Sequence, residues 1–193
     1  MKLIAFCGPH AAGKGDVGKG VFEFFGEGVL ERIVPCTTRH PRPGEKHGRD
    51  YYFLSEEEFE SHFRAGEFVF DVKIRGTQRS GTLRSELLSK KQAIVDIVPQ
   101  GARIMRDLLL KEDKGQSLLV FIYASEEERR RRIKIRDPHV TDLEVERMIR
   151  HDPVDPNPNL YCKDFDLFVQ NADGCLAQSV HTVATVIRHF LRI

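Results

Sequence analysis

The sequence has no tryptophan, no long apolar run and almost no excess of charge of either sign. Its 193 residues carry 30 Lys and Arg against 29 Asp and Glu, which gives a formal net charge of +1. A chain this close to neutral lacks the general attraction that nucleic acids or acidic lipids exert on basic proteins. Its longest apolar runs, LIAF and LLVFI, are far shorter than the roughly 20 residues of a membrane span. We therefore expect a cytoplasmic protein with no nucleic-acid or membrane partner.

Cysteine is too sparse and too scattered for a disulfide framework. The four cysteines form no C-x-x-C pair and have no histidine at zinc-finger spacing, so we expect free thiols and no structural metal site. A chain of this length buries roughly 70% of its unfolded surface on folding, so it needs no such staple. We expect one domain, as a monomer or a homodimer.

Short apolar runs alternate with helical patterns along most of the chain. Runs typical of buried strands lie at 2–7, 93–98, 117–124 and 166–171, and helical patterns cover 17–25, 101–111, 126–136, 142–152 and 176–190. Alternation of this kind predicts a three-layer α/β core around a parallel sheet.

The alternation breaks between residues 35 and 82. Here a loop rich in proline and glycine is followed by a helix that begins at Ser55, a strand pattern at 68–75 and a turn at 76–81. We interpret this stretch as a small mixed α+β lobe, at about 35–82. It would be inserted into a core of residues 1–34 and 83–193.

A glycine-rich loop that ends in lysine follows the first strand. It matches the G-x-x-x-x-G-K pattern of a P-loop, and it lies between a strand and a helix as phosphate binding requires. Loop N–H groups would hold phosphate oxygens, and the lysine would neutralise charge during phosphoryl transfer. The alternative is a chance turn. The predicted ATP-binding residues here are Gly8, Pro9, His10, Ala11, Ala12, Gly13, Lys14, Gly15 and Asp16.

The metal ligand that usually follows the lysine is missing. Gly15 stands where a Ser or Thr hydroxyl would contact Mg²⁺. Asp96 lies within the apolar run 93–98, where a carboxylate is costly to bury unless it has a partner. We expect Asp96 to lie near Mg²⁺, held through water, or else to make a structural hydrogen bond.

A proline-stiffened loop at 37–53 carries two arginines three residues apart. The forks of Arg39 and Arg42 suit a phosphate dianion, Glu45 would orient one of them, and Tyr51 would donate its hydroxyl to the same phosphate. The alternative is a solvated basic loop.

These motifs together resemble the guanylate kinase family. The segment TTRHPRPGEKHGRDYYF resembles its acceptor-binding signature, and SEEEFESHFRAGEFV, AIVDIVPQGA, VFIYASEEERRRRIKIRD and VQNADG follow in family order. The resemblance implies a P-loop NTPase core, an acceptor-binding role for the lobe at about 35–82 and a short lid at about 137–150. It further implies ATP-dependent phosphorylation of a nucleoside monophosphate, GMP or dGMP, with Mg²⁺. It also implies that Arg39, Arg42, Glu45 and Tyr51 hold the acceptor phosphate. By the same resemblance, Arg132, Arg136 and Arg147 act with Lys14 on the transferring phosphoryl group, and Asn171 contacts adenine.

The departures from the family pattern fall on the base-reading positions. Pro35 replaces a serine, Phe70 replaces the glutamate that reads guanine, and Val98 replaces a second strand acid. Thr82 survives as an expected acceptor contact. Asp71 is a further candidate, if a bulge turns it to the face on which Phe70 would otherwise lie.

Two other functions stay open at this point. One is a kinase of the same fold with a different phosphorylated acceptor, and the other is a catalytically silent guanylate-kinase-like module that binds a protein. The retained Lys14 and the three arginines favour an enzyme over the silent module.

Overall fold

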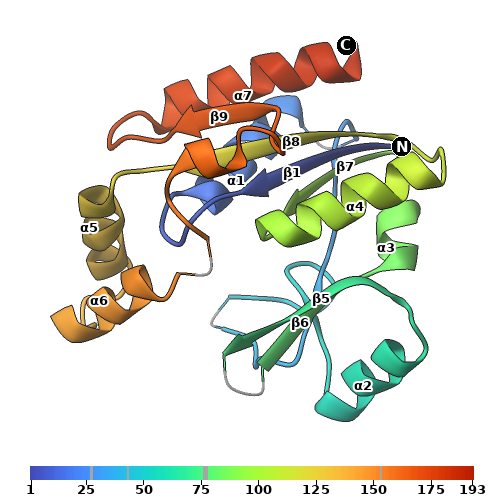
Figure 1. Cartoon of the computed structure of the whole chain (residues 1–193), viewed down its shortest axis with the longest axis horizontal. Helices are drawn as coiled ribbons and strands as arrows, with labels where there is room; N and C mark the ends of the chain where they lie inside the picture. The colour runs from blue at the N-terminus through green and yellow to red at the C-terminus, as the bar shows by residue number, and fades with distance from the viewer. Residues whose placement is uncertain (27, 43, 76–77, 153) are drawn as a thin grey trace.

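The core is a five-stranded parallel sheet in the order β2-β7-β1-β8-β9 (Figure 1). The computed structural model describes residues 1–26, 28–42, 44–75, 78–152 and 154–193. The strands of this sheet are β1 (Lys2–Cys7), β2 (Glu31–Arg32), β7 (Gln92–Asp96), β8 (Gln116–Tyr123) and β9 (Leu167–Gln170). The parallel sheet predicted from the sequence is confirmed.

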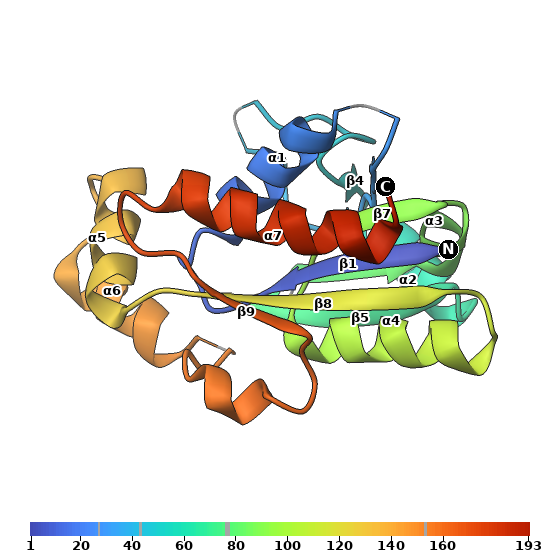
Figure 2. The ribbon, with the colours of Figure 1, turned by 90° about the horizontal axis from the view of Figure 1, so that it is seen from above.

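Helices cover both faces of this sheet, as Figure 2 shows from above. They are α1 (Lys14–Phe25) and α7 (Leu176–Leu191) on one face and α4 (Pro99–Lys111) on the other. Side chains of β1 alternate between the two layers, because successive strand residues point to opposite faces. Ile4 belongs to the buried cluster of Val17 and Val183, whereas Leu3 belongs to that of Met105.

The central strands end at one edge of the sheet. Phe6 of β1 pairs in register with Asp96 of β7 and with Val120 of β8, and Gly8 begins the loop that follows β1. In open parallel sheets, ligands bind at the carboxyl ends of the strands, so this edge is where the site is expected.

Asp96 is the last residue of β7 and is exposed. The prediction that it lies inside a buried strand is therefore wrong. Ile97 still donates a backbone hydrogen bond to Phe6, but Pro99 then begins α4 and turns the chain away from the sheet.

A second sheet interrupts the alternation, in the order β4-β3-β6-β5. Its strands are β3 (Cys36–Thr37), β4 (Tyr52–Phe53), β5 (Phe68–Arg75) and β6 (Gln78–Leu83); α2 (Glu56–Arg64) lies beside it, and α3 (Arg84–Leu88) returns the chain to the core. The turn predicted at 76–81 is wrong for 78–81, which lie in β6, and 76–77 lie outside the described residues. Pairing with β3 and β5 makes 78–81 a strand, and the Ser80 hydroxyl donates to the Cys36 carbonyl (2.9 Å).

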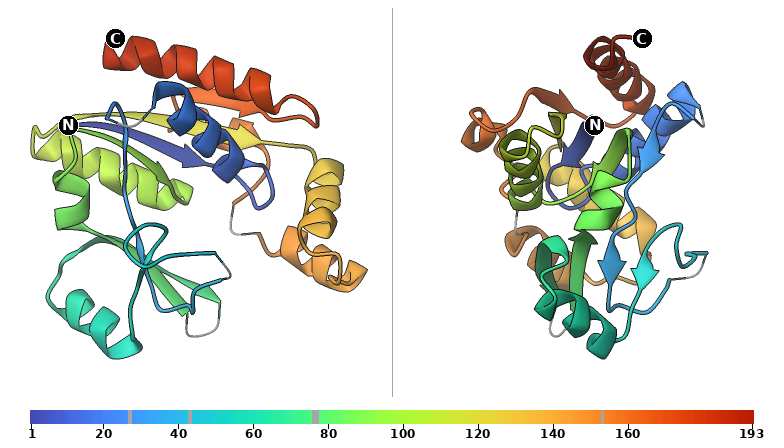
Figure 3. Two further views of the ribbon diagram at one scale, coloured as in Figure 1. Left: turned by 180° about the vertical axis from the view of Figure 1, so that it is seen from behind. Right: turned by 90° about the vertical axis from the view of Figure 1, so that its right-hand side faces the viewer.

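Two further helices stand beyond the carboxyl edge of the core sheet, α5 (Glu126–Arg136) and α6 (Asp142–Arg150) (Figures 1 and 3). Each begins with a complete capping box, at Ser125 and Thr141. Arg130 of α5 pairs with Glu146 of α6 at 2.6 Å. Helix α6 ends at Arg150, two residues earlier than predicted, and a 3₁₀ turn, η1 (Pro158–Tyr161), follows. Within the described ranges, no helix is long and apolar enough to cross a membrane.

Two glycines of α1 test how closely α1 packs on α7. A Cβ at Gly20 would lie 2.6 Å from Cγ2 of Val180, whereas a Cβ at Gly18 would lie 3.7 Å from the Phe6 ring. We expect Gly18→Ala to raise the free energy of unfolding by about 0.5–1 kcal/mol, because alanine favours a helix. Gly20→Ala should lower it by about 1–3 kcal/mol through overpacking. Urea unfolding of both variants measures this, and equal stabilisation by both would contradict the packing described here.

Candidate active site

The loop at 8–13 reverses the chain between β1 and α1 at the carboxyl edge. Its turn requires positive φ at Gly8 (+144°), Ala11 (+59°) and Gly13 (+88°). A Cβ on Gly8 would lie 1.9 Å from the Ile122 carbonyl oxygen of β8, so only glycine fits between the two strands. Gly13 is the N-cap of α1, and the first-turn N–H groups of a helix have no acceptor within the helix. The loop and the start of α1 thus have the backbone arrangement of a P-loop, with N–H groups that can donate to an anion.

Lys14 is folded back over this loop. Its Nζ donates to the carbonyl oxygen of Pro9 at 3.1 Å, and the Ala12 N–H donates to the same oxygen at 3.3 Å. Burial raises the pKa of the Asp96 carboxyl, and the Lys14 charge partly offsets this rise. Lys14 and Asp96 therefore bring opposite charges to the same edge of the sheet.

The outward-facing carbonyls of the loop are bound by side chains from α5 and from the end of β9. Arg129 Nε donates to the His10 oxygen (2.7 Å), and Arg132 Nη1 donates to the Ala12 oxygen (3.2 Å). The Asn171 amide also donates to Ala12 (3.0 Å). Hydrogen bonds from these side chains to its carbonyls therefore fix the loop backbone before any ligand binds.

Asn171 does not face a base in this structure. Asn171 is buried, its side-chain Nδ2 donates to the Ala12 carbonyl oxygen, and its Oδ1 accepts from the Ser179 hydroxyl at 3.2 Å. The expected adenine contact by this side chain is therefore not what the geometry provides. Asn171 positions the loop, because both ends of its amide are engaged in the protein.

The three arginines expected at the phosphoryl group lie in different surroundings. Arg132 binds loop carbonyls, the Asn171 carbonyl (2.7 Å) and the Asp173 carboxylate (2.8 Å). Arg136 Nη2 lies 2.8 Å from Nε2 of His10, at the loop. Arg147 lies exposed on α6. The structure thus brings Arg132 and Arg136 to the loop, whereas for Arg147 it shows an exposed position on α6.

Asp96 is accessible to solvent, yet the protein around it displaces enough water to raise the pKa of its carboxyl. Lys14 opposes this effect. Gly15 and Asp16 lie exposed in the first turn of α1. In the part of the chain that the structure describes, no group of three metal-ligating side chains occurs, so a cation here would need ligands from water or substrate as well.

The loop that follows β3 holds a preformed arginine fork. Arg39 donates twice to Glu45, at 2.8 and 2.9 Å, and Glu45 also accepts the Arg42 backbone N–H at 2.7 Å. The hydrogen bonds from Arg39 lower the pKa of Glu45, so the carboxylate stays ionised. The Arg42 residue is exposed.

Tyr51 connects this loop to the edge of the core sheet. The Arg39 guanidinium lies 5.1 Å from the centre of the Tyr51 ring. Burial raises the pKa of the Tyr51 hydroxyl, the charge of Asp96 raises it further, and Arg39 lowers it. The electrostatic influence of Asp96 on Tyr51 links the Arg39 loop to the carboxyl edge that bears the P-loop.

Asp71 and Thr82 lie on opposite faces of the β5–β6 pair. Thr82 is buried and pairs with Phe70, whereas Asp71 pairs with Gly81. A bulge does occur, but it lies between Phe68 and Phe70, before Asp71, so it does not bring Asp71 to the Thr82 face. The Asp71 carboxylate instead lies 3.5 Å from Arg79. The proposed role of Asp71 in acceptor binding is therefore not supported.

Phe70 itself points toward the core. A Cβ on Gly101 of α4 would lie 2.8 Å from the Phe70 ring, and Phe70 is 8% exposed. An apolar ring thus occupies the face on which the resemblance expects a base-reading carboxylate.

The sequence pattern did not single out two residues of the site. Arg129 lies within the helical pattern at 126–136 and is 1% exposed, and Asp152 is the last residue of the helical pattern at 142–152. Ile133 gives a usable signal, because it is buried in this charged helix and Arg129 lies four residues before it, on the same face.

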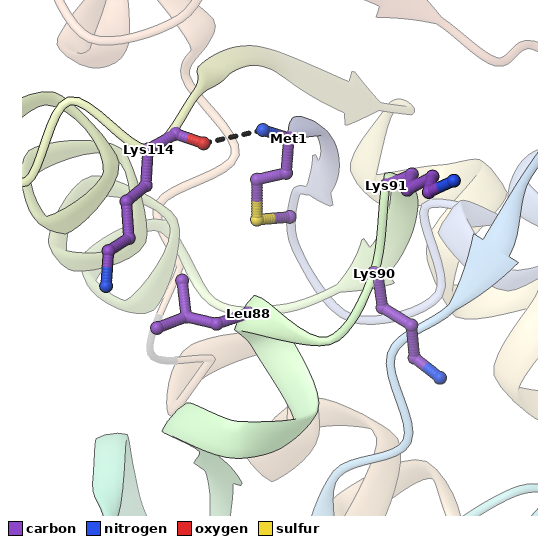
Figure 4. Close-up of a pocket in the computed structure, with 5 residues that line it drawn as sticks. All are labelled: Met1, Leu88, Lys90, Lys91 and Lys114. Atoms are coloured by element: carbon purple, nitrogen blue, oxygen red, sulfur yellow. Dashed lines mark hydrogen bonds between the residues drawn. The ribbon is translucent and has the colours of Figure 1, made fainter.

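A separate pocket of about 460 Å³ opens at the opposite edge of the core sheet, beside the start of β1 (Figure 4). The Met1 amine donates there to the Lys114 carbonyl at 2.5 Å. Lys90 and Lys114 are paired with Glu86 and Glu112. This pocket lies at the amino ends of the strands and is distinct from the P-loop site.

Comparison with known proteins identifies the relatives of this chain. A family model described as guanylate kinase matches residues 1–190. A guanylate kinase of Thermotoga maritima is 34% identical over 194 residues, which are 97% of this chain and 86% of the relative. A guanylate kinase of Chlorobaculum tepidum is 35% identical over 196 residues, which are 98% and 93% of the two chains.

Solved structures share the fold. A guanylate kinase from Anaplasma phagocytophilum superposes with a TM-score of 0.66 at 22% identity, over 99% of this chain and 85% of that one. A gluconokinase from Sinorhizobium meliloti has a TM-score of 0.52 at 17% identity, over 99% and 94%. At these identities the likeness concerns the fold alone.

The raised pKa of Asp96 predicts a stability cost for its ionised form. The pKa of Asp96 in the folded state exceeds that of the unfolded chain, about 3.9. The free energy of unfolding therefore falls as the pH rises from the unfolded-state pKa through the folded-state pKa. Asp96→Asn should therefore raise the free energy of unfolding at pH 7, by less than about 1 kcal/mol because the group is solvent-accessible. The gain should vanish toward pH 3. Urea unfolding at both pH values checks this, and a variant less stable than wild type at pH 7 would contradict it.

Proposed function

The chain belongs to the guanylate kinase family, and we propose how its residues divide the work of that family's reaction. The enzyme phosphorylates GMP at the expense of ATP, so the γ-phosphoryl group passes to a phosphate oxygen of GMP and leaves ADP and GDP. The observation that carries the residue assignment is the P-loop, held between β1 and α1 with its lysine at the same edge as Asp96 and the Arg39 loop.

ATP binds at the loop of residues 8–16 in this proposal. The N–H groups at the start of α1 donate hydrogen bonds to the phosphate oxygens, and Lys14 leaves the Pro9 carbonyl to neutralise the β- and γ-oxygens. The support for this is a backbone already fixed by Arg129, Arg132 and Asn171, so that little order is lost on binding.

The acceptor phosphate binds between Arg39, Arg42 and Tyr51. Glu45 holds the Arg39 fork in one orientation, which leaves its outer edge for the phosphate dianion. The half-buried Tyr51 hydroxyl keeps its proton at neutral pH, because its pKa is raised, and so it can donate a hydrogen bond.

Asp96 is the residue that fits a Mg²⁺ site. Magnesium is commonly held by one or two carboxylates with water and substrate phosphates, and a cation would relieve the desolvated carboxylate of Asp96. Gly15 offers no hydroxyl, so Asp16, exposed in the first turn of α1, is the second candidate. When bound, Mg²⁺ would neutralise the negative charge of the ATP phosphates.

Arg136 already lies at the loop, and Arg147 completes the site by moving with α6. The reaction needs positive charge around the transferring group rather than a general base, since the acceptor oxygen already belongs to a phosphate. Closure on ATP of the lid, residues 137–150 with α6, would carry Arg147 from its exposed position toward the P-loop. Arg132, by its contacts with the loop, acts on the transferring group through the loop backbone.

Removal of the Lys14 charge tests the ATP site. Lys14→Ala should lower kcat for GDP formation by at least about a hundredfold, because a positioned charge at the transferring phosphoryl group contributes several kcal/mol. Lys19→Ala is the matched control, since Lys19 is an exposed lysine of the same helix, paired with Glu23. Near-normal kcat in Lys14→Ala, with an unchanged circular dichroism spectrum, would remove Lys14 from the mechanism.

Substitutions on the two faces of the β5–β6 pair should differ in their effect on GMP phosphorylation. Thr82→Val should raise KM for GMP by about tenfold, because it removes a buried hydroxyl from the face shared with Phe70, which in this proposal meets the acceptor. Asp71→Asn should change kcat/KM by less than about twofold, because Asp71 faces away. Steady-state rates of the two variants with GMP and with AMP measure these kinetic constants. A selective loss of GMP use in Asp71→Asn would show that Asp71 reads the base.

A further inference from the structure

The backbone N–H and C=O of His10, in the P-loop, both form hydrogen bonds with one ion pair. The His10 N–H donates to Oδ2 of Asp152 at 2.6 Å, and the His10 carbonyl accepts from Nε of Arg129 at 2.7 Å. Arg129 Nη2 closes the ring on Asp152 Oδ2. Donor and acceptor of one peptide residue are therefore satisfied by two side chains that also bind each other.

This ring is buried. The side chains of Arg129 and Asp152 are 1% and 4% exposed, and Asp152 Oδ1 accepts a further hydrogen bond from the Val154 N–H at 3.1 Å. Buried ion pairs are often no more stabilising than apolar side chains of the same size, so stability alone gives no reason for the pair. What apolar side chains could not supply is the fixed direction of the two His10 groups.

The ring also joins the P-loop to the bases of both outer helices. Arg129 lies near the start of α5, and Asp152 lies two residues beyond the end of α6. Arg136, the last residue of α5, reaches the His10 ring as well. His10 is thus the point at which α5, α6 and the loop are connected.

We propose that Arg129 and Asp152 are positioning residues that set the P-loop backbone for the nucleotide phosphates and anchor α5 and α6 to it. The proposal rests on the proposed function in that the loop holds ATP. Arg129 has a second effect, because it neutralises a carboxylate that lies against the loop and that would repel phosphate if it stood alone.

The test replaces the charged ring by an uncharged pair of similar volume, Arg129→Met with Asp152→Asn. Calorimetry with ADP and Mg²⁺ should show affinity weaker by about tenfold or more, the loss expected when hydrogen bonds to charged groups are removed. Affinity for GMP, measured in the same way, should stay within about twofold. The single variant Arg129→Met should bind ADP more weakly than the double variant, because Asp152 is left unneutralised.

The matched control is Arg130→Met with Glu146→Gln. This pair also joins α5 to α6 through an arginine and a glutamate, but it is half-exposed and does not contact the P-loop. Its ADP affinity should stay within about twofold of wild type. Arg129→Lys serves if the double variant does not fold, since lysine keeps the charge without the planar fork and should lose part of the ADP affinity.

Unchanged ADP affinity in the folded double variant, or in Arg129→Lys where the double variant does not fold, would overturn the proposal. So would equal weakening of ADP and GMP, which would indicate general loosening of the structure. Failure of the proposed function is distinguishable, because wild type would then not bind ADP at all or would form no GDP.

Discussion

The structure depends on one constraint of the backbone: a loop that turns its N–H groups toward a phosphate must turn its carbonyls into the protein. Those carbonyls need donors, because an unpaired buried carbonyl is costly. Arg129 and Arg132 on α5, and Asn171 after β9, provide them. The positions of α5 and of the β9–α7 connection therefore follow from the needs of residues 9–12. The same contacts explain why polar side chains such as Arg129 and Asn171 are buried beside the apolar core.

Local patterns predicted the core and its P-loop but not the contacts behind the loop. The β1–loop–α1 unit follows from an apolar run, two glycines and a lysine, all within 25 residues. Arg129 and Asn171 act on the loop from more than 100 residues away in sequence, so no local pattern around the loop indicates their contacts with it. Residues 78–81 were expected to turn, but pairing with β3, some 40 residues earlier, makes them a strand. For Asp71, only the position of the bulge decides the face, and the sequence does not specify that position.

The two sides of the acceptor region differ in how far they are organised. The phosphate side is rigid, because Glu45 holds Arg39 through two hydrogen bonds and aromatic rings flank the guanidinium. The base side combines a buried Thr82 with the apolar ring of Phe70, which packs on α4. If the acceptor phosphate binds at Arg39 and Tyr51, as proposed, affinity for the acceptor should come mainly from that phosphate, close to the core edge that carries Asp96.

The central claim is direct phosphoryl transfer between two nucleotides held at this edge. The most direct measurement follows the label from [γ-³²P]ATP during incubation with the protein, GMP and Mg²⁺, with the products separated by chromatography. The account predicts that label appears in the β-phosphate of GDP, one for one with the ADP formed, and that this transfer stops when the divalent metal is chelated. Label that accumulates only as inorganic phosphate, or that stays in ATP while GMP is present, would contradict it.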